Sequence, residues 1–325
     1  MGMWLIVSRI YRSFCSMLTS PQRLQGRSWL SELIMRMTKQ LFTESQTKGL
    51  VHLRQQVDAT QVPSPYFRKV NFSNISIDSV PCLLTQARQG GLIDTVIVYL
   101  HGGGYVCGSS NSYKNISSAL AYKSGCLVIT PDYRLAPEHP APAAQEDCLN
   151  VVKEIFKQYS RYRIVLIGDS AGGALAVHCA TRLAIETKQT DKAKSLTSLV
   201  LLSPWVDPLA SNGTMNTNQA NDFLTKGFIQ KSYQAVLQER SQYESYLNFT
   251  EADLSMLPPT LIQCGSGELF FDQIQTFASQ LKQQGVDVTV QNFNAQFHVF
   301  QIFAPILNDA NRAINNIVQF IRNKH

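Results

Sequence analysis

The residues best suited to chemistry surround Ser170, in the run 168–172, which reads Gly-Asp-Ser-Ala-Gly. The apolar residues 164–167 precede this run and an alanine-rich stretch follows it, so the motif joins a predicted strand to a predicted helix. In that context G-x-S-x-G makes a sharp turn that exposes the serine hydroxyl, and glycines are needed because β-carbons would collide across the turn. A serine that only caps a helix does not require the preceding strand. We therefore predict that Ser170 is a nucleophile.

A second glycine-rich run closes another predicted strand, because residues 101–105 read His-Gly-Gly-Gly-Tyr directly after the apolar residues 96–100. Acyl transfer passes through a tetrahedral oxyanion, and backbone N–H groups from such a loop and from Ala171 can stabilise it, each by about 10²–10³ in rate. The alternative, a phosphate-binding loop, is disfavoured because the run lacks both the Lys-Ser/Thr ending and the G-x-G-x-x-G spacing. We predict an oxyanion loop that His101 helps to shape.

A serine nucleophile needs a general base, and His298 is the best placed of the six histidines. It lies in a predicted loop between the last strand and the C-terminal helix. The third member, an acid, is expected between serine and histidine in chain order. Two carboxylates follow the predicted strand 259–264: Glu268 and Asp272. We favour Glu268, which is nearest the strand end, and keep Asp272 as the alternative acid, because its place near a helix start suits capping or loop support.

The elements that must position these residues form an α/β pattern. Short β-branched runs alternate with helical stretches from about residue 92, which is typical of a mostly parallel sheet flanked by helices. The predicted strands are 93–100, 126–130, 163–167, 196–202, 259–264 and 286–293, and the predicted helices are 112–124, 141–159, 171–186, 271–284 and 304–322. Gly125 and Gly285 stand where helix C-caps are expected.

Two regions do not follow the alternation: residues 1–60, which have helical character, and the insertion 207–257. We expect both to contribute to a helical cap over a catalytic core made of 61–206 and 258–325, so that the chain forms one catalytic domain. Within the first region Met3, Val7, Ile10, Phe14 and Met17 share one face of a predicted helix. We expect that helix to pack on the protein, with a flexible lid or a helix that contacts a membrane surface as the alternatives.

Composition narrows the class of protein. The formal charge of +6 is spread thinly, without a basic block or zinc-ligand spacing, so nucleic-acid binding is disfavoured. The seven cysteines are scattered and never spaced as C-x-x-C, which favours a reducing compartment, and we expect a cytoplasmic protein. The apolar start is shorter than the roughly 20 residues that span a bilayer.

Taken together, these motifs resemble the hormone-sensitive lipase family of esterases, of the bacterial family IV type, over roughly residues 67–322. The segments that carry the resemblance are 101–104, 132–140 (Asp-Tyr-Arg-Leu-Ala-Pro-Glu-His-Pro), 168–172, 203–207 (Ser-Pro-Trp-Val-Asp) and the His298 loop. The resemblance implies an α/β-hydrolase fold with a helical cap, no metal or organic cofactor, and oxyanion donors at Gly103, Gly104 and Ala171. It also implies hydrolysis of small-molecule esters with short to medium acyl chains.

At the acid position many relatives carry Asp followed by Pro-Leu-Arg-Asp, whereas this chain has Glu-Leu-Phe-Phe-Asp at 268–272. Tyr105 and Asp169, which stand beside the two glycine motifs, are predicted to contact substrate. Deacetylation or lactone opening would use the same machinery, and a binding protein that does not turn its ligand over remains the alternative of a different class. The oligomeric state is not predicted.

Overall fold

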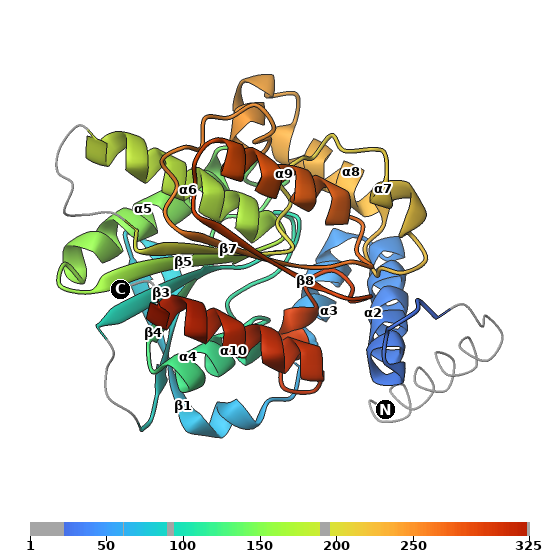
Figure 1. Ribbon diagram of the computed structural model, residues 1–325, viewed down its shortest axis with the longest axis horizontal. Coiled ribbons are helices and arrows are strands. Elements are labelled where there is room, and N and C mark those ends of the chain that lie inside the picture. Colours follow the sequence, from blue (N-terminus) through green and yellow to red (C-terminus); the bar gives the residue numbers. More distant parts are fainter. Residues whose placement is uncertain (1–22, 61, 90–93, 189–195, 324–325) are drawn as a thin grey trace.

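The computed structural model describes residues 23–60, 62–89, 94–188 and 196–323 (Figure 1). Its centre is an eight-stranded sheet with strand order β1-β2-β4-β3-β5-β6-β7-β8. The strands are β1 (Val70–Ile77), β2 (Val80–Ala87), β3 (Thr95–Leu100), β4 (Leu127–Pro131), β5 (Arg163–Asp169), β6 (Ser198–Leu202), β7 (Thr260–Gly265) and β8 (Val288–Phe293). The predicted helix around residues 3–17 lies outside the described residues and stays a prediction.

The six strands β3 to β8 run parallel to one another, and all six were predicted from the sequence within a few residues. Every residue of β3, β4, β6 and β7 is buried, as near-continuous apolar runs require when helices cover both faces of a sheet. The carboxyl ends of these strands therefore meet at one edge, where polar residues that follow them can converge.

The edge of the sheet formed by β1 and β2 was not predicted. These strands make a hairpin in which Asp78 and Ser79 both take positive φ, 49° and 67°, as a two-residue hairpin turn with the twist of the strands requires. The hairpin pairs antiparallel with β4 through β2, so the sheet is mostly and not wholly parallel. Exposed polar residues interrupt β1, which is why no buried-strand pattern marked it.

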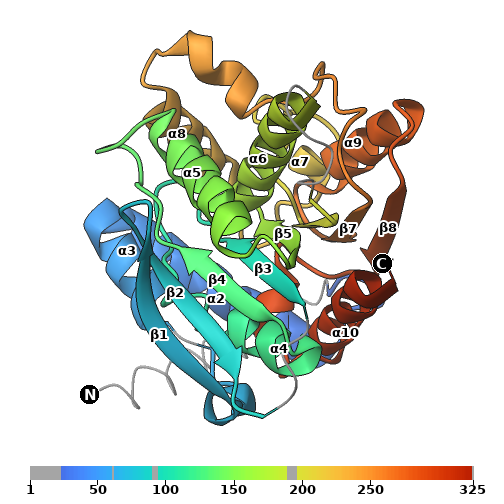
Figure 2. The same cartoon turned by 90° about the vertical axis from the view of Figure 1, so that its left-hand side faces the viewer.

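Helices cover both faces of the sheet, as predicted (Figures 1 and 2). On one face lie α4 (Lys114–Ser124) and α10 (Asn308–Asn323); on the other lie α5 (Ala143–Gln158), α6 (Ala171–Lys188) and α9 (Phe271–Gln283). Gly125 ends α4 in the left-handed conformation, and Gly285 follows α9 with a φ of 83°, so both predicted glycine stops are confirmed.

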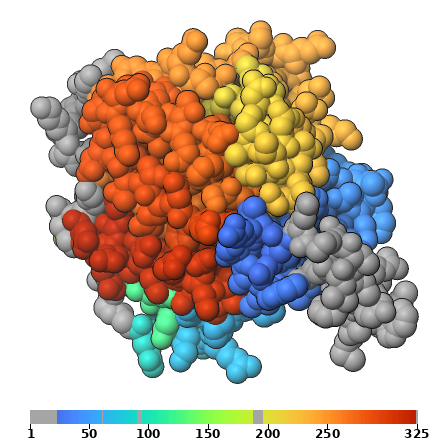
Figure 3. Space-filling view, turned by 45° about the vertical axis from the view of Figure 1, so that its right-hand side comes forward, coloured from blue at the N-terminus to red at the C-terminus, as the bar shows by residue number. Residues whose placement is uncertain are grey.

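The remaining helices belong to the two regions that broke the alternation. The first region contains α2 (Trp29–Thr47) and α3 (Leu50–Ala59), and η1 (Pro65–Lys69) leads from it into β1; the insertion contains α7 (Thr214–Thr217), α8 (Lys226–Leu237) and η2 (Ser241–Tyr246). A short turn, η3 (Phe300–Phe303), follows His298. Figure 3 shows α2, in blue, lying against the insertion in yellow and the C-terminal part in red. None of the helices in the described part of the chain is long and apolar enough to cross a bilayer.

Candidate active site

Ser170 occupies the sharp turn between β5 and α6. Its φ is 51°, a conformation that is unfavourable for a residue with a side chain and that marks strained turns at functional sites. The turn is fixed by the neighbouring strand, because the Ser170 N–H donates to the Leu202 carbonyl (2.9 Å) and the Ser170 carbonyl accepts from the Trp205 N–H (2.9 Å). The hydroxyl is thus held at the N-terminus of α6, where backbone N–H groups favour negative charge.

Gly168 and Gly172 are required because a β-carbon at either position would collide with the backbone across the turn, as predicted. A β-carbon on Gly168 would lie 2.1 Å from the Gly172 carbonyl oxygen, and one on Gly172 would lie 2.0 Å from the Leu100 carbonyl oxygen. Backbone cannot yield at such distances without moving the turn. The closeness of Gly172 to Leu100 also joins the Ser170 turn to the end of β3, from which the loop of residues 101–105 begins.

The loop of residues 101–105 is held beside Ser170 by buried polar groups. Gly103 and Gly104 have φ values of 117° and 63°, and both line the same cavity as Ser170. The Gly102 N–H donates to the Asp169 carboxylate (2.9 Å), which also accepts from the hydroxyls of Tyr99 and Tyr113 (2.9 Å each). Asp169 therefore supports the loop, and burial raises its pKa to about 6.

His101 contributes to the shape of this loop, as predicted. Its ring is fully buried and stacks on Tyr133, with ring centroids 4.3 Å apart, and the Tyr133 hydroxyl donates to the His101 carbonyl (2.6 Å). Both interactions fix the backbone from which the following glycines present their N–H groups.

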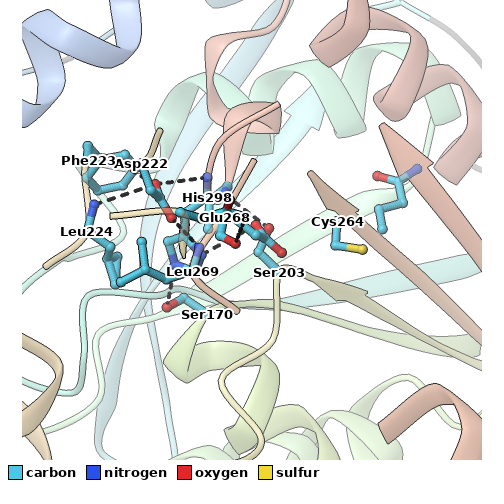
Figure 4. Close-up of polar contacts among 12 residues, drawn as sticks. Ser170, Ser203, Asp222, Phe223, Leu224, Cys264, Glu268, Leu269 and His298 are labelled. Atoms are coloured by element: carbon cyan, nitrogen blue, oxygen red, sulfur yellow. Dashed lines mark hydrogen bonds and ion pairs between the residues drawn. The ribbon is translucent and has the colours of Figure 1, made fainter. Parts of the chain in front are cut away.

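His298 and Ser170, 128 positions apart in the chain, are brought together: His298 Nε2 lies 2.9 Å from Ser170 Oγ (Figure 4). The imidazole is 2% exposed and packs edge-on against Phe270, with ring centroids 5.0 Å apart. Burial lowers the pKa of His298, and the carboxylates of Asp222 and Asp169 oppose that shift. A neutral imidazole next to a serine hydroxyl is the arrangement that general-base catalysis needs.

The structure brings Glu268, and not Asp272, to His298. Glu268 is fully buried, and its Oε2 lies 3.6 Å from His298 Nδ1, within ion-pair range but longer than a hydrogen bond. Burial raises the pKa of Glu268 to about 8, partly opposed by the Ser203 hydroxyl. Asp272 is exposed in the first turn of α9, where its Oδ2 accepts from the Thr214 N–H (2.8 Å), the loop support that the sequence predicts.

A further buried carboxylate, Asp222, was not predicted. Its Oδ1 accepts from the N–H groups of Phe223 (2.8 Å) and His298 (3.2 Å), and its Oδ2 accepts from the Leu269 N–H (2.9 Å) (Figure 4). It lies in the insertion before α8, and the only local signal is an Asp preceding an apolar pair. Its partners are 47 and 76 positions away in the chain, so no sequence spacing could reveal them.

A cavity of about 190 Å³ opens at Ser170 and His298. Apolar side chains from α2, α3 and the insertion form most of its wall, with Leu41, Phe42, Val57, Phe223 and Phe228 among them. Phe42 makes edge-to-face contacts with Phe223 and Phe228, at centroid distances of 5.7 and 4.7 Å. From the sequence, residues 1–60 and the insertion were both expected to contribute to a cap over the core. In the structure α2 and α3 supply the part of the cavity wall that comes from the first of these regions.

Of the two predicted substrate-contacting residues, Asp169 lines this cavity and Tyr105 does not. Tyr105 is buried in a separate small cavity with Trp205, their ring centroids 6.0 Å apart. Its backbone has a φ of 64°, and the residue is 2% exposed. Ala171, the third predicted oxyanion donor, is the first residue of α6, next to Ser170.

Within the described ranges no group of three or more His, Cys, Asp and Glu side chains is arranged to hold a metal ion. The six cysteines described there are unpaired and buried. Ser170, His298 and Asp169 are among the polar residues that line the cavity.

Comparison with known proteins agrees with this geometry. A family model described as alpha/beta hydrolase fold matches residues 97–302. An acetyl-hydrolase of Streptomyces hygroscopicus is 32% identical over 73% of this chain and 77% of its own length, and the carboxylesterase/phospholipase LipF of Mycobacterium tuberculosis is 32% identical over 78% and 68%.

Among solved structures, an esterase from the bacterial hormone-sensitive lipase family superposes with a TM-score of 0.83 at 29% identity, covering 92% of this chain and 99% of that one. A hormone-sensitive lipase from a metagenome library gives a TM-score of 0.79 at 28% identity, covering 89% and 97%. On the residues matched and on the eight-stranded, mostly parallel sheet, the chain belongs to the hormone-sensitive lipase family of α/β-hydrolase esterases.

Proposed function

We propose that this esterase cleaves small-molecule carboxylic esters through an acyl-enzyme, with Ser170 as nucleophile, His298 as general base and Glu268 as the acid. The observation that carries the proposal is the 2.9 Å contact between His298 Nε2 and Ser170 Oγ at the floor of an apolar cavity. Strained turns are retained mainly at functional sites, so a histidine that contacts a serine in such a turn supports a catalytic role for both residues.

In the acylation step His298 Nε2 takes the hydroxyl proton as Ser170 Oγ attacks the ester carbonyl carbon. The C–O bond to the alcohol then breaks, and His298 returns the proton to the departing alkoxide. Water repeats the sequence on the acyl-enzyme and releases the carboxylic acid. In both steps the backbone N–H groups of Gly103, Gly104 and Ala171 stabilise the oxyanion.

Glu268 has the role of holding the imidazole in the productive tautomer. The 3.6 Å separation from Nδ1 needs to shorten by less than an ångström to become a hydrogen bond. Catalytic hydrogen bonds in unliganded enzymes are often this long and tighten only when substrate is bound. The ionised form of Glu268 makes this hydrogen bond, and the imidazolium that forms as Ser170 attacks supplies the attraction that draws the carboxylate in.

Short to medium acyl chains fit the cavity best, because its wall is apolar and is closed by Phe42, Phe223 and Phe228. We propose that α2, α3 and the insertion 207–257 act as the cap that encloses the acyl group. A panel of nitrophenyl esters of increasing chain length measures this preference. A maximum of kcat/KM at two to about eight acyl carbons is expected, and activity that rises steadily to long chains would contradict it.

The role of Ser170 is tested by Ser170→Ala. We expect kcat to fall on the order of 10⁶-fold, as for other triad nucleophiles. The free energy of unfolding should change little, because the hydroxyl faces the cavity and its loss leaves no hole in the core. Residual hydrolysis above about 1% in the purified, folded variant would refute the assignment of Ser170.

A further inference from the structure

The two loops that carry His298 and Glu268 are tied together by one side chain of the insertion, Asp222. Its carboxylate is fully buried, and every hydrogen bond that it makes is one it accepts from a backbone N–H group. One of these donors is the N–H of His298 itself. Another belongs to Leu269, the residue directly after Glu268, so the carboxylate spans both catalytic loops.

The neighbours of Asp222 reinforce this link. Asn218, also in the insertion, donates its side-chain amide to the carbonyls of Ser266 (3.1 Å) and Glu268 (3.0 Å). Residues 218–222 therefore bind the acid loop through both its N–H and its carbonyl groups. A peptide plane of a loop that is hydrogen-bonded at both kinds of group cannot rotate without losing a buried hydrogen bond, which is unfavourable.

The region before α2 also contacts the insertion and the loop that carries His298. Arg27, 1% exposed, donates to the carbonyls of Asn221 (2.7 Å) and Ala295 (2.5 Å) and pairs with Glu32 of α2 (3.1 Å). Asn221 precedes Asp222, and Ala295 begins the turn that ends at His298. The N-terminal region, the insertion and both catalytic loops thus meet at two buried charges.

The charge of Asp222 also faces the imidazole. Among the described residues, the carboxylates that face His298 are Asp222 from the insertion, Asp169 from the end of β5 and Glu268 from the end of β7. Two cations, Arg27 and Lys39, interact electrostatically with Asp222. The anion of Asp222 opposes the effect of burial on the pKa of His298. An anion there favours the imidazolium that forms as Ser170 attacks.

We propose that Asp222 is a positioning residue of the active site: it fixes the backbones on which His298 and Glu268 are carried, and it keeps a negative charge beside the imidazole. This inference rests on the triad proposed above. It assigns to the insertion a part in the chemical step, in addition to lining the acyl pocket.

The variant Asp222→Asn tests it, because the amide removes the charge and turns one acceptor oxygen into a donor that faces backbone N–H groups. We expect kcat for a nitrophenyl acetate to fall about 10- to 100-fold, the scale of a small misplacement of a catalytic group. KM should stay within about threefold. The acid limb of the pH profile of kcat/KM should move to lower pH, because His298 loses an anion that favours its protonated form.

The matched control is Asp272→Asn. Asp272 is also a carboxylate that accepts a backbone N–H from the insertion, but it is exposed and does not touch His298. Its variant should keep kcat within about twofold and leave the acid limb unmoved. If Asp222→Asn does not fold, Asp222→Ser replaces it, since the hydroxyl keeps one uncharged acceptor for the Phe223 N–H.

The inference is overturned if a folded Asp222 variant keeps kcat within twofold, or if its acid limb does not move while kcat falls. It is also overturned if neither Asp222 variant folds while Asp272→Asn does, since Asp222 would then serve the fold alone. Ser170→Ala separates the two proposals. An inactive Ser170→Ala with a fully active Asp222→Asn refutes only the positioning role, and an active Ser170→Ala refutes the triad on which it rests.

Discussion

Ser170 and His298 lie 2.9 Å apart, yet the chain holds them by different means. Ser170 is held by its neighbours in and beside the central sheet: its φ is strained, two glycines make close backbone contacts, and its backbone is hydrogen-bonded to Leu202 and Trp205. The histidine is held by side chains from distant parts of the chain, above all Asp222 and Arg27. The support of Ser170 is local, so a short sequence motif reveals it. The support of His298 depends on contacts between distant parts of the chain, so no motif reveals it.

Replacing Glu268 should show how much the activity depends on the carboxylate that faces His298. We expect Glu268→Gln to lower kcat by about 10⁴-fold, the loss seen when the orienting carboxylate of a serine-protease triad becomes an amide. Steady-state hydrolysis of a nitrophenyl ester measures it. Asp272→Asn is measured in parallel. If it loses more activity than Glu268→Gln, the acid is Asp272 and not Glu268.

A substitution in the Ser170 turn should instead lower the free energy of unfolding. In Gly172→Ala the new β-carbon would lie 2.0 Å from the Leu100 carbonyl oxygen and 2.5 Å from that of His101. Overpacking against backbone costs typically 1–3 kcal/mol and more where nothing can yield, so we expect a loss of about 3 kcal/mol in urea unfolding and a displaced Ser170.

The control for that substitution is Gly227→Ala, in the first turn of α8. No atom lies within 4 Å of a β-carbon there, so helix propensity alone predicts a gain of up to about 1 kcal/mol. Equal effects of the two substitutions on the free energy of unfolding would show that the close contact at the turn is unimportant.

The buried acid of the histidine side should make stability depend on pH. The folded state holds the Glu268 proton up to about pH 8, whereas the unfolded state releases it near the ordinary value of 4.5. The folded state then binds more protons, so the free energy of unfolding falls as pH rises through this window. His298, whose folded pKa is lowered, acts in the opposite direction but only around and below its unfolded value of 6.5.

Between pH 7 and 8 the Glu268 effect therefore dominates, and we expect the free energy of unfolding to fall by about 1 kcal/mol, below the limit of 1.36 per unit for one proton. Urea unfolding of the wild type and of Glu268→Gln at pH 7.0, 7.5 and 8.0 measures it. A wild-type slope that Glu268→Gln reproduces would mean that another group carries the dependence.

The smallest expected effect concerns the cap. Phe42→Ala opens the wall between α2 and the insertion, so the ratio of kcat/KM for an octanoate ester to that for an acetate ester should rise severalfold. Phe67→Ala, which removes a half-buried ring that packs on Phe72 and does not line the cavity, is the control. A uniform loss on all esters in Phe42→Ala would leave that ring with a packing role only.

These contrasts explain what the sequence could predict. The six parallel strands, the nucleophile turn and the glycine loop are each written in fewer than about ten consecutive residues, and the structure has all of them. Chain order and strand ends were enough to favour Glu268 over Asp272, since only a residue at the strand's end lies beside the next loop.

The features that the sequence did not predict depend on contacts between residues far apart in the chain. The hairpin of β1 and β2 has a polar pattern that is set by its edge position, and its turn uses Asp78 and Ser79 in place of a glycine. Tyr105 was expected at the substrate because it adjoins the glycines, but its buried ring packs near Trp205, which is 100 positions away in the chain. Asp222 and Arg27 act through contacts 47 to 268 positions apart, which no local pattern encodes.

The claim that Ser170 is the nucleophile is tested most directly by covalent labelling with an organophosphate. We expect one phosphoryl group to attach to Ser170 Oγ with departure of the reagent's leaving group. Peptide mass spectrometry should find it on the segment containing residue 170, and esterase activity should disappear in proportion to labelling. Ser170→Ala should take up none. Labelling of a different residue, or ester hydrolysis that persists when Ser170 is fully modified, would contradict the account.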